Sequence, residues 1–178
     1  MNWSLSLLGV VALLYVHAAF PATPASEIPE YIVPPHRAVL EKWLATTKSS
    51  RVATDEDCSC SDDIARMRRG YGGAWKANPD FHPYYVVGDF NDDGHTDFAV
   101  VVIRGSTNFT REVAIFNGPF LENAAKSPAY VGGKHGGALF FGPPRPKPWR
   151  LIVGPFESEG SLLIPKGSTY VFTLNNCC

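Results

Sequence analysis

The chain has 178 residues, a length that fits one domain, and 45% of them are hydrophobic, which is enough for a buried core. The 16 Lys and Arg residues nearly balance the 17 Asp and Glu residues, so the net charge is −1. This balance gives no electrostatic basis for binding nucleic acid or an anionic membrane, and neither is expected as a partner. The 16 glycines and 15 prolines indicate many turns and short strands, which excludes a helical bundle.

The first 25 residues are predicted to be a secretory signal peptide. Their apolar run, residues 5–16, has the length of a signal-peptide core and is too short to span a bilayer. Small residues follow, so cleavage is expected after Ala18 or after Ala25. The leader lacks the usual Lys or Arg, which leaves a buried helix or an uncleaved anchor as alternatives. We therefore expect one globular domain, residues 26–178, that is secreted or periplasmic and has no membrane anchor after cleavage.

Two short helices are predicted in the first part of this domain. Within residues 36–48, apolar side chains recur on one helical face at Val39, Leu40, Trp43 and Leu44. Residues 48–59 are polar and are interpreted as a loop. A second helix is expected from Asp62 to Arg69, because acidic residues at its start and basic residues at its end suit the helix dipole.

The four cysteines support an exported protein with disulfide bonds. They form two close pairs, Cys58 with Cys60 and Cys177 with Cys178. A bond between the adjacent residues 177 and 178 would strain the local geometry, so we expect each C-terminal cysteine to pair with one of the other two. The alternative, a four-thiolate metal site, usually needs two C-x2-C pairs, and this spacing does not match.

From residue 83 onward the pattern changes to short strands separated by turns. The expected strand segments are PYYVVGDF, DFAVVVIRG, REVAIFNG, ALFFG, WRLIVG, SLLIP and TYVFTL. LENAAKS, residues 121–127, is expected to form about one helical turn. Most strands follow one another without a long helix between them, which favours antiparallel pairing. The predicted fold is α+β, with N-terminal helices packed on a curved, mainly antiparallel sheet of about five to seven strands.

An acidic loop, GDFNDDGHTD, lies between the first two strand segments. Its alternate residues provide the oxygen ligands that calcium prefers, and a glycine allows the sharp turn between them. The predicted calcium ligands are Asp89, Asn91, Asp93, His95 through its backbone carbonyl, and Asp97. An EF-hand would need a glutamate twelve positions into the loop, where this chain has Val100, so a calcium loop in a β-hairpin is expected instead.

The segment GDFNDDGHTDFAVV resembles the calcium loop of FG-GAP/VCBS repeats, which occur in integrin-type β-propellers. The resemblance covers residues 88–102 and implies calcium as the bound ion, with the ligand set given above. Those propellers contain several copies of the loop, and this chain has one. A propeller is therefore not expected, and the chain is more similar to small exported single-domain proteins that carry one such loop.

Two histidines beside the acidic loop are candidates for a catalytic role. His82 or His95 could serve as the base of a calcium-dependent hydrolase, with Asp92 as an additional carboxylate. Such an enzyme needs a concave pocket where a histidine and carboxylates converge. The sequence contains no GxSxG, HExxH or phosphate-loop motif, so an enzyme is the less favoured interpretation.

The favoured function is an exported structural or binding module whose hairpin loop is ordered by calcium. A second interpretation is an inhibitor or immunity-like protein that binds another protein through an exposed tip. The candidate tips are residues 132–137 and 142–148. The sequence does not identify the partner.

Overall fold

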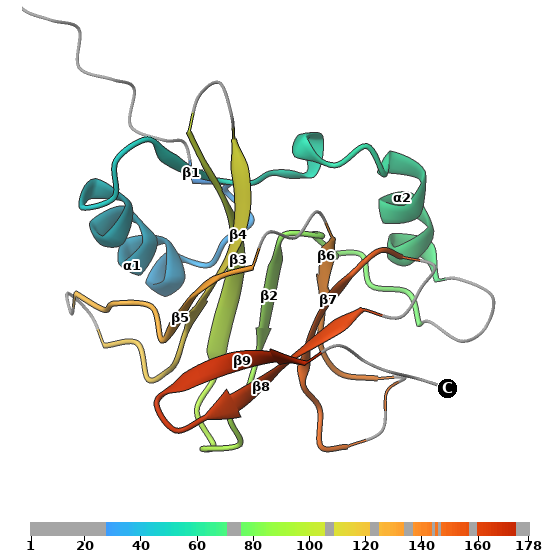
Figure 1. The fold of residues 1–178 in the computed structure, drawn as a ribbon. Helices are drawn as coiled ribbons and strands as arrows, with labels where there is room; N and C mark the ends of the chain where they lie inside the picture. Colours follow the sequence, from blue (N-terminus) through green and yellow to red (C-terminus); the bar gives the residue numbers. More distant parts are fainter. Residues whose placement is uncertain are drawn as a thin grey trace, which may run out of the picture.

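The computed structural model describes residues 28–70, 76–105, 109–121, 125–133, 137–143, 145, 147–156 and 160–173 (Figure 1). In chain order the elements are α1 (Pro34–Ala45), β1 (Ser50–Val52), the short 3-10 helix η1 (Asp55–Asp57), α2 (Ser61–Arg69), β2 (Tyr85–Gly88), β3 (Asp97–Arg104), β4 (Thr110–Phe116), β5 (Tyr130–Gly132), β6 (Ala138–Phe140), β7 (Leu151–Gly154), β8 (Ser161–Lys166) and β9 (Thr169–Thr173). All paired strands are antiparallel and form two sheets, one of five strands and one of four.

Strand β3 is the centre of the first sheet. It pairs along one side with β4, from Phe98 opposite Phe116 to Arg104 opposite Thr110. On its other side, β2 pairs with residues 97–100 and β1 pairs with residues 102–104, so two short strands share one edge. In the second sheet, β6 to β9 follow one another in chain order.

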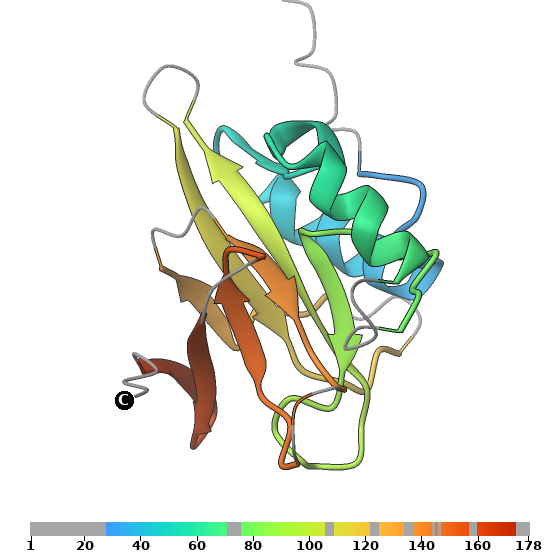
Figure 2. The same ribbon diagram turned by 90° about the vertical axis from the view of Figure 1, so that its right-hand side faces the viewer.

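The first sheet is covered on both faces, as Figures 1 and 2 show, with α1 on one side and the second sheet on the other. This explains why β3 is an unbroken apolar run and does not alternate between apolar and polar residues. On the α1 side, the helix packs its apolar stripe, Val39, Leu40 and Leu44, against the β3 side chains Phe98, Val100 and Val102.

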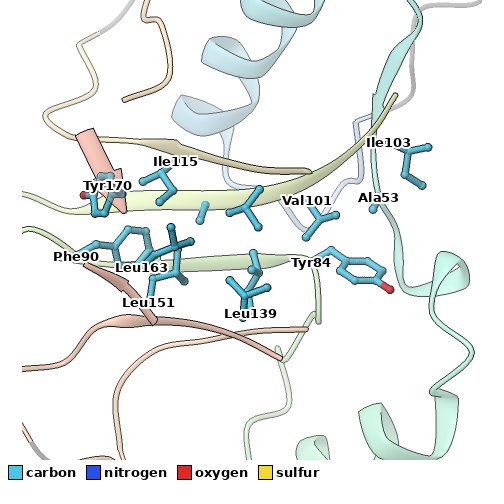
Figure 3. Packing of buried hydrophobic residues seen from close by; sticks show 13 residues of the cluster. Ala53, Tyr84, Phe90, Val101, Ile103, Ile115, Leu139, Leu151, Leu163 and Tyr170 are labelled. Carbon is cyan, nitrogen blue, oxygen red and sulfur yellow. The ribbon is translucent and has the colours of Figure 1, made fainter. Parts of the chain in front are cut away.

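The main core lies between the two sheets. Figure 3 shows Val101 and Ile115 of the first sheet pointing toward Leu139, Leu151 and Leu163 of the second. These five side chains are at most 1% exposed. The sheets are also joined by a backbone hydrogen bond, in which Leu139 N donates to Pro83 O over 2.7 Å.

Helix α2 forms a smaller cluster at one end of the second sheet. Its residues Ile64 and Met67 pack with Phe81, and Phe140 and Phe156 lie against this group. Acidic residues occupy the first turn of α2 and basic residues occupy its last turn, as the helix dipole favours. Within the described residues, no helix has both the length and the apolar character needed to cross a membrane.

The predicted α+β class with antiparallel strands is confirmed, and the described residues form neither a closed barrel nor a propeller. The strands divide into two sheets, whereas the sequence predicted one. The strands β1 and β5 were not predicted, because each has only three residues and depends on pairing with distant segments. Part of the predicted turn at 121–127 and all of the predicted signal peptide lie outside the described residues.

The cysteine pairing differs from the predicted arrangement. Cys58 is bonded to Cys60, with the two Cα atoms 5.0 Å apart. This bond excludes cross-links from the same two sulfurs to the C-terminal cysteines. Cys177 and Cys178 lie outside the described residues. The prediction overlooked the fact that one intervening residue leaves two Cα atoms within the range that a disulfide can bridge.

Candidate functional site

The acidic loop joins β2 to β3 as a hairpin that Gly88 and Asp97 close by pairing with each other. Inside it, the carboxylate of Asp89 accepts hydrogen bonds from two backbone N–H groups, Asp93 N at 3.1 Å and Gly94 N at 2.9 Å. The turn between them requires positive φ angles, 59° at Asp92 and 82° at Gly94. Asp, Asn and Gly are the residues that adopt this conformation most readily, so the composition of the loop matches its backbone.

Asn91 and Asp93 are linked to each other within the loop. The side-chain oxygen of Asn91 accepts the backbone N–H of Asp93 at 3.1 Å, and its amide nitrogen donates to Asp93 Oδ2 over 2.9 Å. The other oxygen of Asp93 accepts the backbone N–H of His95 at 2.8 Å. This last hydrogen bond is the main reason that the pKa of the Asp93 carboxyl lies below its ordinary value.

Asp97 is the one charged residue of the loop that is completely buried, with 0% of its surface exposed. Each of its carboxylate oxygens accepts one backbone N–H, from Phe90 and from Gly118, both at 2.8 Å. Burial raises the pKa of Asp97, the two hydrogen bonds oppose the rise, and the charges of Asp93 and Asp89 add to it. Among the described residues, Asp97 forms no ion pair.

The loop therefore holds all five predicted calcium ligands on one short segment, but their side chains mainly accept N–H groups of the loop itself. Within the described part of the chain, no group of three or more His, Cys, Asp or Glu side chains is placed so that it could hold a metal ion. Asp92, which the calcium pattern does not use, pairs with Arg150 through an Nη1–Oδ2 distance of 2.6 Å. This ion pair joins the loop to the segment just before β7.

A second cluster of polar residues surrounds His82, just before β2. The Nδ1 atom of its ring lies 3.0 and 3.1 Å from the two carboxylate oxygens of Asp55. Arg68 binds the same carboxylate over 2.6 Å and donates from Nε to the carbonyl of Phe81. The ring of Tyr31 stacks on the ring of His82, with centroids 3.4 Å apart. Three other segments of the chain thus converge on one histidine.

This cluster lines a cavity of about 950 Å³, within the size range of ligand sites. The walls come from the segment before α1, from α1 itself, from η1 and from α2. The aromatic and ionisable residues of its lining are Glu30, Tyr31, Arg37, Glu41, Asp55, Glu56, Arg68 and His82.

The two candidate histidines have different surroundings. His82 meets a carboxylate at the wall of a cavity, as the hydrolase hypothesis required, whereas His95 is exposed in the acidic loop. The sequence analysis missed Tyr31, Asp55 and Arg68. Asp55 precedes His82 by 27 positions, and only the folded chain brings them together. No local pattern in the sequence signals such a contact.

Comparisons of the chain with protein-family models, with curated proteins and with solved structures gave no match.

Proposed function

We propose that the protein is an exported binding module whose β2–β3 hairpin loop is ordered by one calcium ion. The supporting observation is the buried carboxylate of Asp97, which has hydrogen bonds but no ion pair among the described residues. Burying a carboxylate without a positive charge is costly, and the nearby charges of Asp89 and Asp93 increase that cost. A bound cation would offset all three negative charges.

The ligand set of this proposal consists of Asp89, Asn91, Asp93 and Asp97 through side-chain oxygens and His95 through its backbone carbonyl. The present hydrogen bonds do not exhaust these oxygens, because a carboxylate oxygen that accepts one N–H keeps a second lone pair. Calcium takes six to eight oxygens, so water would supply the remainder. The N–H bonds to Asp89 and Asp97 would stay in place and hold those two carboxylates for the ion.

Export belongs to the same proposal. Weak calcium sites, with Kd of about 10⁻⁴–10⁻³ M, suit proteins outside the cell, where calcium is abundant. The apolar leader and the bond between Cys58 and Cys60 are compatible with secretion or a periplasmic location, since disulfides persist in oxidising compartments.

We expect calcium to raise the thermal stability of the wild-type protein and of the Asp92→Asn variant, but not that of the Asp93→Asn variant. With a Kd of about 10⁻⁴ M, about 1 mM calcium adds about 1.4 kcal/mol to the free energy of unfolding. Both substitutions remove one negative charge from the same loop, yet only Asp93 is a proposed ligand. Thermal melts in calcium and in chelator measure the difference. Equal calcium shifts in the two variants, or no shift in the wild-type protein, would contradict the proposal.

A calcium-dependent hydrolase is less compatible with the layout of the chain. His82 and the acidic loop lie at opposite ends of β2, whose four residues span about 10 Å. An ion in the loop would therefore not polarise a substrate held beside His82. The observations are more compatible with the second alternative, in which this chain binds another protein. The cavity around His82 is the site that they favour for such binding.

A further inference from the structure

The cavity around His82 is rich in hydrogen-bond acceptors. The Nδ1 atom lies 3.0 and 3.1 Å from the two oxygens of Asp55 and 3.3 Å from Arg68 Nη2, so this ring nitrogen is already engaged within the chain. Nε2 has no hydrogen-bond partner among the described residues, and 16% of the side chain is exposed. The Nε2 atom is therefore the ring nitrogen of His82 that a ligand can contact.

The two cations of the cavity are already engaged. Arg68 binds Asp55 and the carbonyl of Phe81. The Nη2 group of Arg37 lies 3.3, 2.8 and 3.5 Å from the carbonyl oxygens of Pro29, Glu30 and Ile32. Both guanidinium groups are thus held by acceptors of the chain, although the buried Nε of Arg37 has no hydrogen-bond partner among the described residues.

The acidic residues are in the opposite situation. Glu30, Glu41 and Glu56 line the cavity, and none of them makes an ion pair or a side-chain hydrogen bond within the described residues. With Asp55, the cavity has four carboxylates against two guanidinium groups, which leaves two net negative charges. The electrostatic preference of the cavity is for a cation.

A separate observation also points to a missing polar partner. The hydroxyl oxygen of Tyr31 is buried and has no hydrogen-bond partner among the described residues. Burial, followed by the charges of Asp55 and Asp57, raises the pKa of this hydroxyl, so it stays neutral. A buried polar group without a partner costs free energy, and a donor from a ligand would offset this cost once the side chains around the hydroxyl open to admit it.

We propose that this cavity binds the guanidinium group of an arginine presented by another protein. Guanidinium carries five N–H donors in a planar fork, which suits acceptors spread over several walls better than a compact ammonium does. A cavity of about 950 Å³ also has room for residues that flank the arginine. The inference specifies the binding partner of the proposed module and does not depend on calcium in the acidic loop.

The test is calorimetric titration of the full chain with the peptide acetyl-Gly-Arg-Gly-amide. The matched control peptide has citrulline in place of arginine, which keeps the shape and removes the charge. We expect the citrulline peptide and free arginine to bind at least about tenfold more weakly than the arginine peptide. The titrations are run in calcium and in chelator, so that failure of the calcium proposal is recognised separately.

Three variants connect the binding to this cavity. Glu41→Gln/Glu56→Gln and His82→Phe are each expected to weaken the arginine peptide at least about fivefold. The phenylalanine keeps an aromatic ring that can stack on Tyr31 and removes both ring nitrogens. Glu112→Gln is the control that removes a negative charge outside the cavity, where Glu112 pairs with Arg104 on the first sheet, and it should bind normally. Near-ultraviolet circular dichroism checks that each variant is folded.

Several results would overturn the proposal. They are no saturable binding up to about 10 mM arginine peptide, equal binding of the citrulline peptide, and unchanged affinity in the cavity variants. Equal affinity for free arginine would overturn the assignment to a protein partner.

Discussion

Replacing Asp97 by alanine is expected to lower the free energy of unfolding by about 2–5 kcal/mol. The change leaves the N–H groups of Phe90 and Gly118 without the acceptor that each now has at 2.8 Å. Because Asp97 is completely buried, water cannot replace the lost oxygens without opening the start of β3. Chemical denaturation of the variant and the wild-type protein in chelator measures the loss.

The Asp97→Asn variant removes the charge of this residue and keeps one of its two acceptor oxygens, because the amide NH2 group cannot accept an N–H. Since the folded pKa of Asp97 is raised, the folded state holds the proton more readily than the unfolded state does. The contribution of this protonation to the stability of the fold is therefore complete in acid, and it is lost as the pH rises through the folded pKa of Asp97. Asparagine does not titrate, so the stability of the asparagine variant should lack this decline.

For the alanine variant, a loss of stability below about 0.5 kcal/mol would show that the two N–H groups do not depend on Asp97.

The second large effect is a loss of stability in acid that depends on His36. This side chain is 5% exposed, it stacks on Phe98, and its Nδ1 atom lies 2.8 Å from the hydroxyl of Tyr85. Burial lowers its pKa from 6.5 to about 4. Between these two values the unfolded state takes up a proton and the folded state does not. Stability is therefore present above about pH 6.5 and falls by up to about 3 kcal/mol as the pH drops to about 4.

A matched variant isolates this histidine from the other titrating groups. His36→Phe keeps an aromatic ring against Phe98 and removes the titration, although it also removes the partner of the Tyr85 hydroxyl. We expect the loss of stability between about pH 7.5 and about pH 4.5 to be about 2–3 kcal/mol smaller in the variant. The same pH dependence in both proteins would refute the assignment.

The sequence was most informative where a pattern repeats over several residues. The apolar spacing around Val39 and Leu44 predicted α1, and the apolar run from Phe98 predicted β3. The acidic loop was found between two strands because its turn residues are themselves diagnostic. These features depend on near neighbours in the chain, which a single sequence displays.

Features that arise from distant contacts were not predicted. The division into two sheets depends on β5 ending the first sheet and β6 starting the second, although only a few residues separate them. The cavity around His82 requires Tyr31 and Asp55 to meet the histidine after folding. The burial of Asp97 was also hidden, because its spacing in the loop indicated only a calcium ligand.

Strand β3 also determines where the chain is vulnerable to aggregation. The run FAVVVI is uncharged and strongly β-forming, which is the composition of segments that assemble into cross-β fibrils. In the folded protein both of its edges are paired and both of its faces are covered, so it offers no template to a second chain. The charged residues at its ends, Asp97 and Arg104, act as gatekeepers while it is still unpaired. The risk is therefore confined to the newly made or unfolded chain, before β4 and β2 have docked.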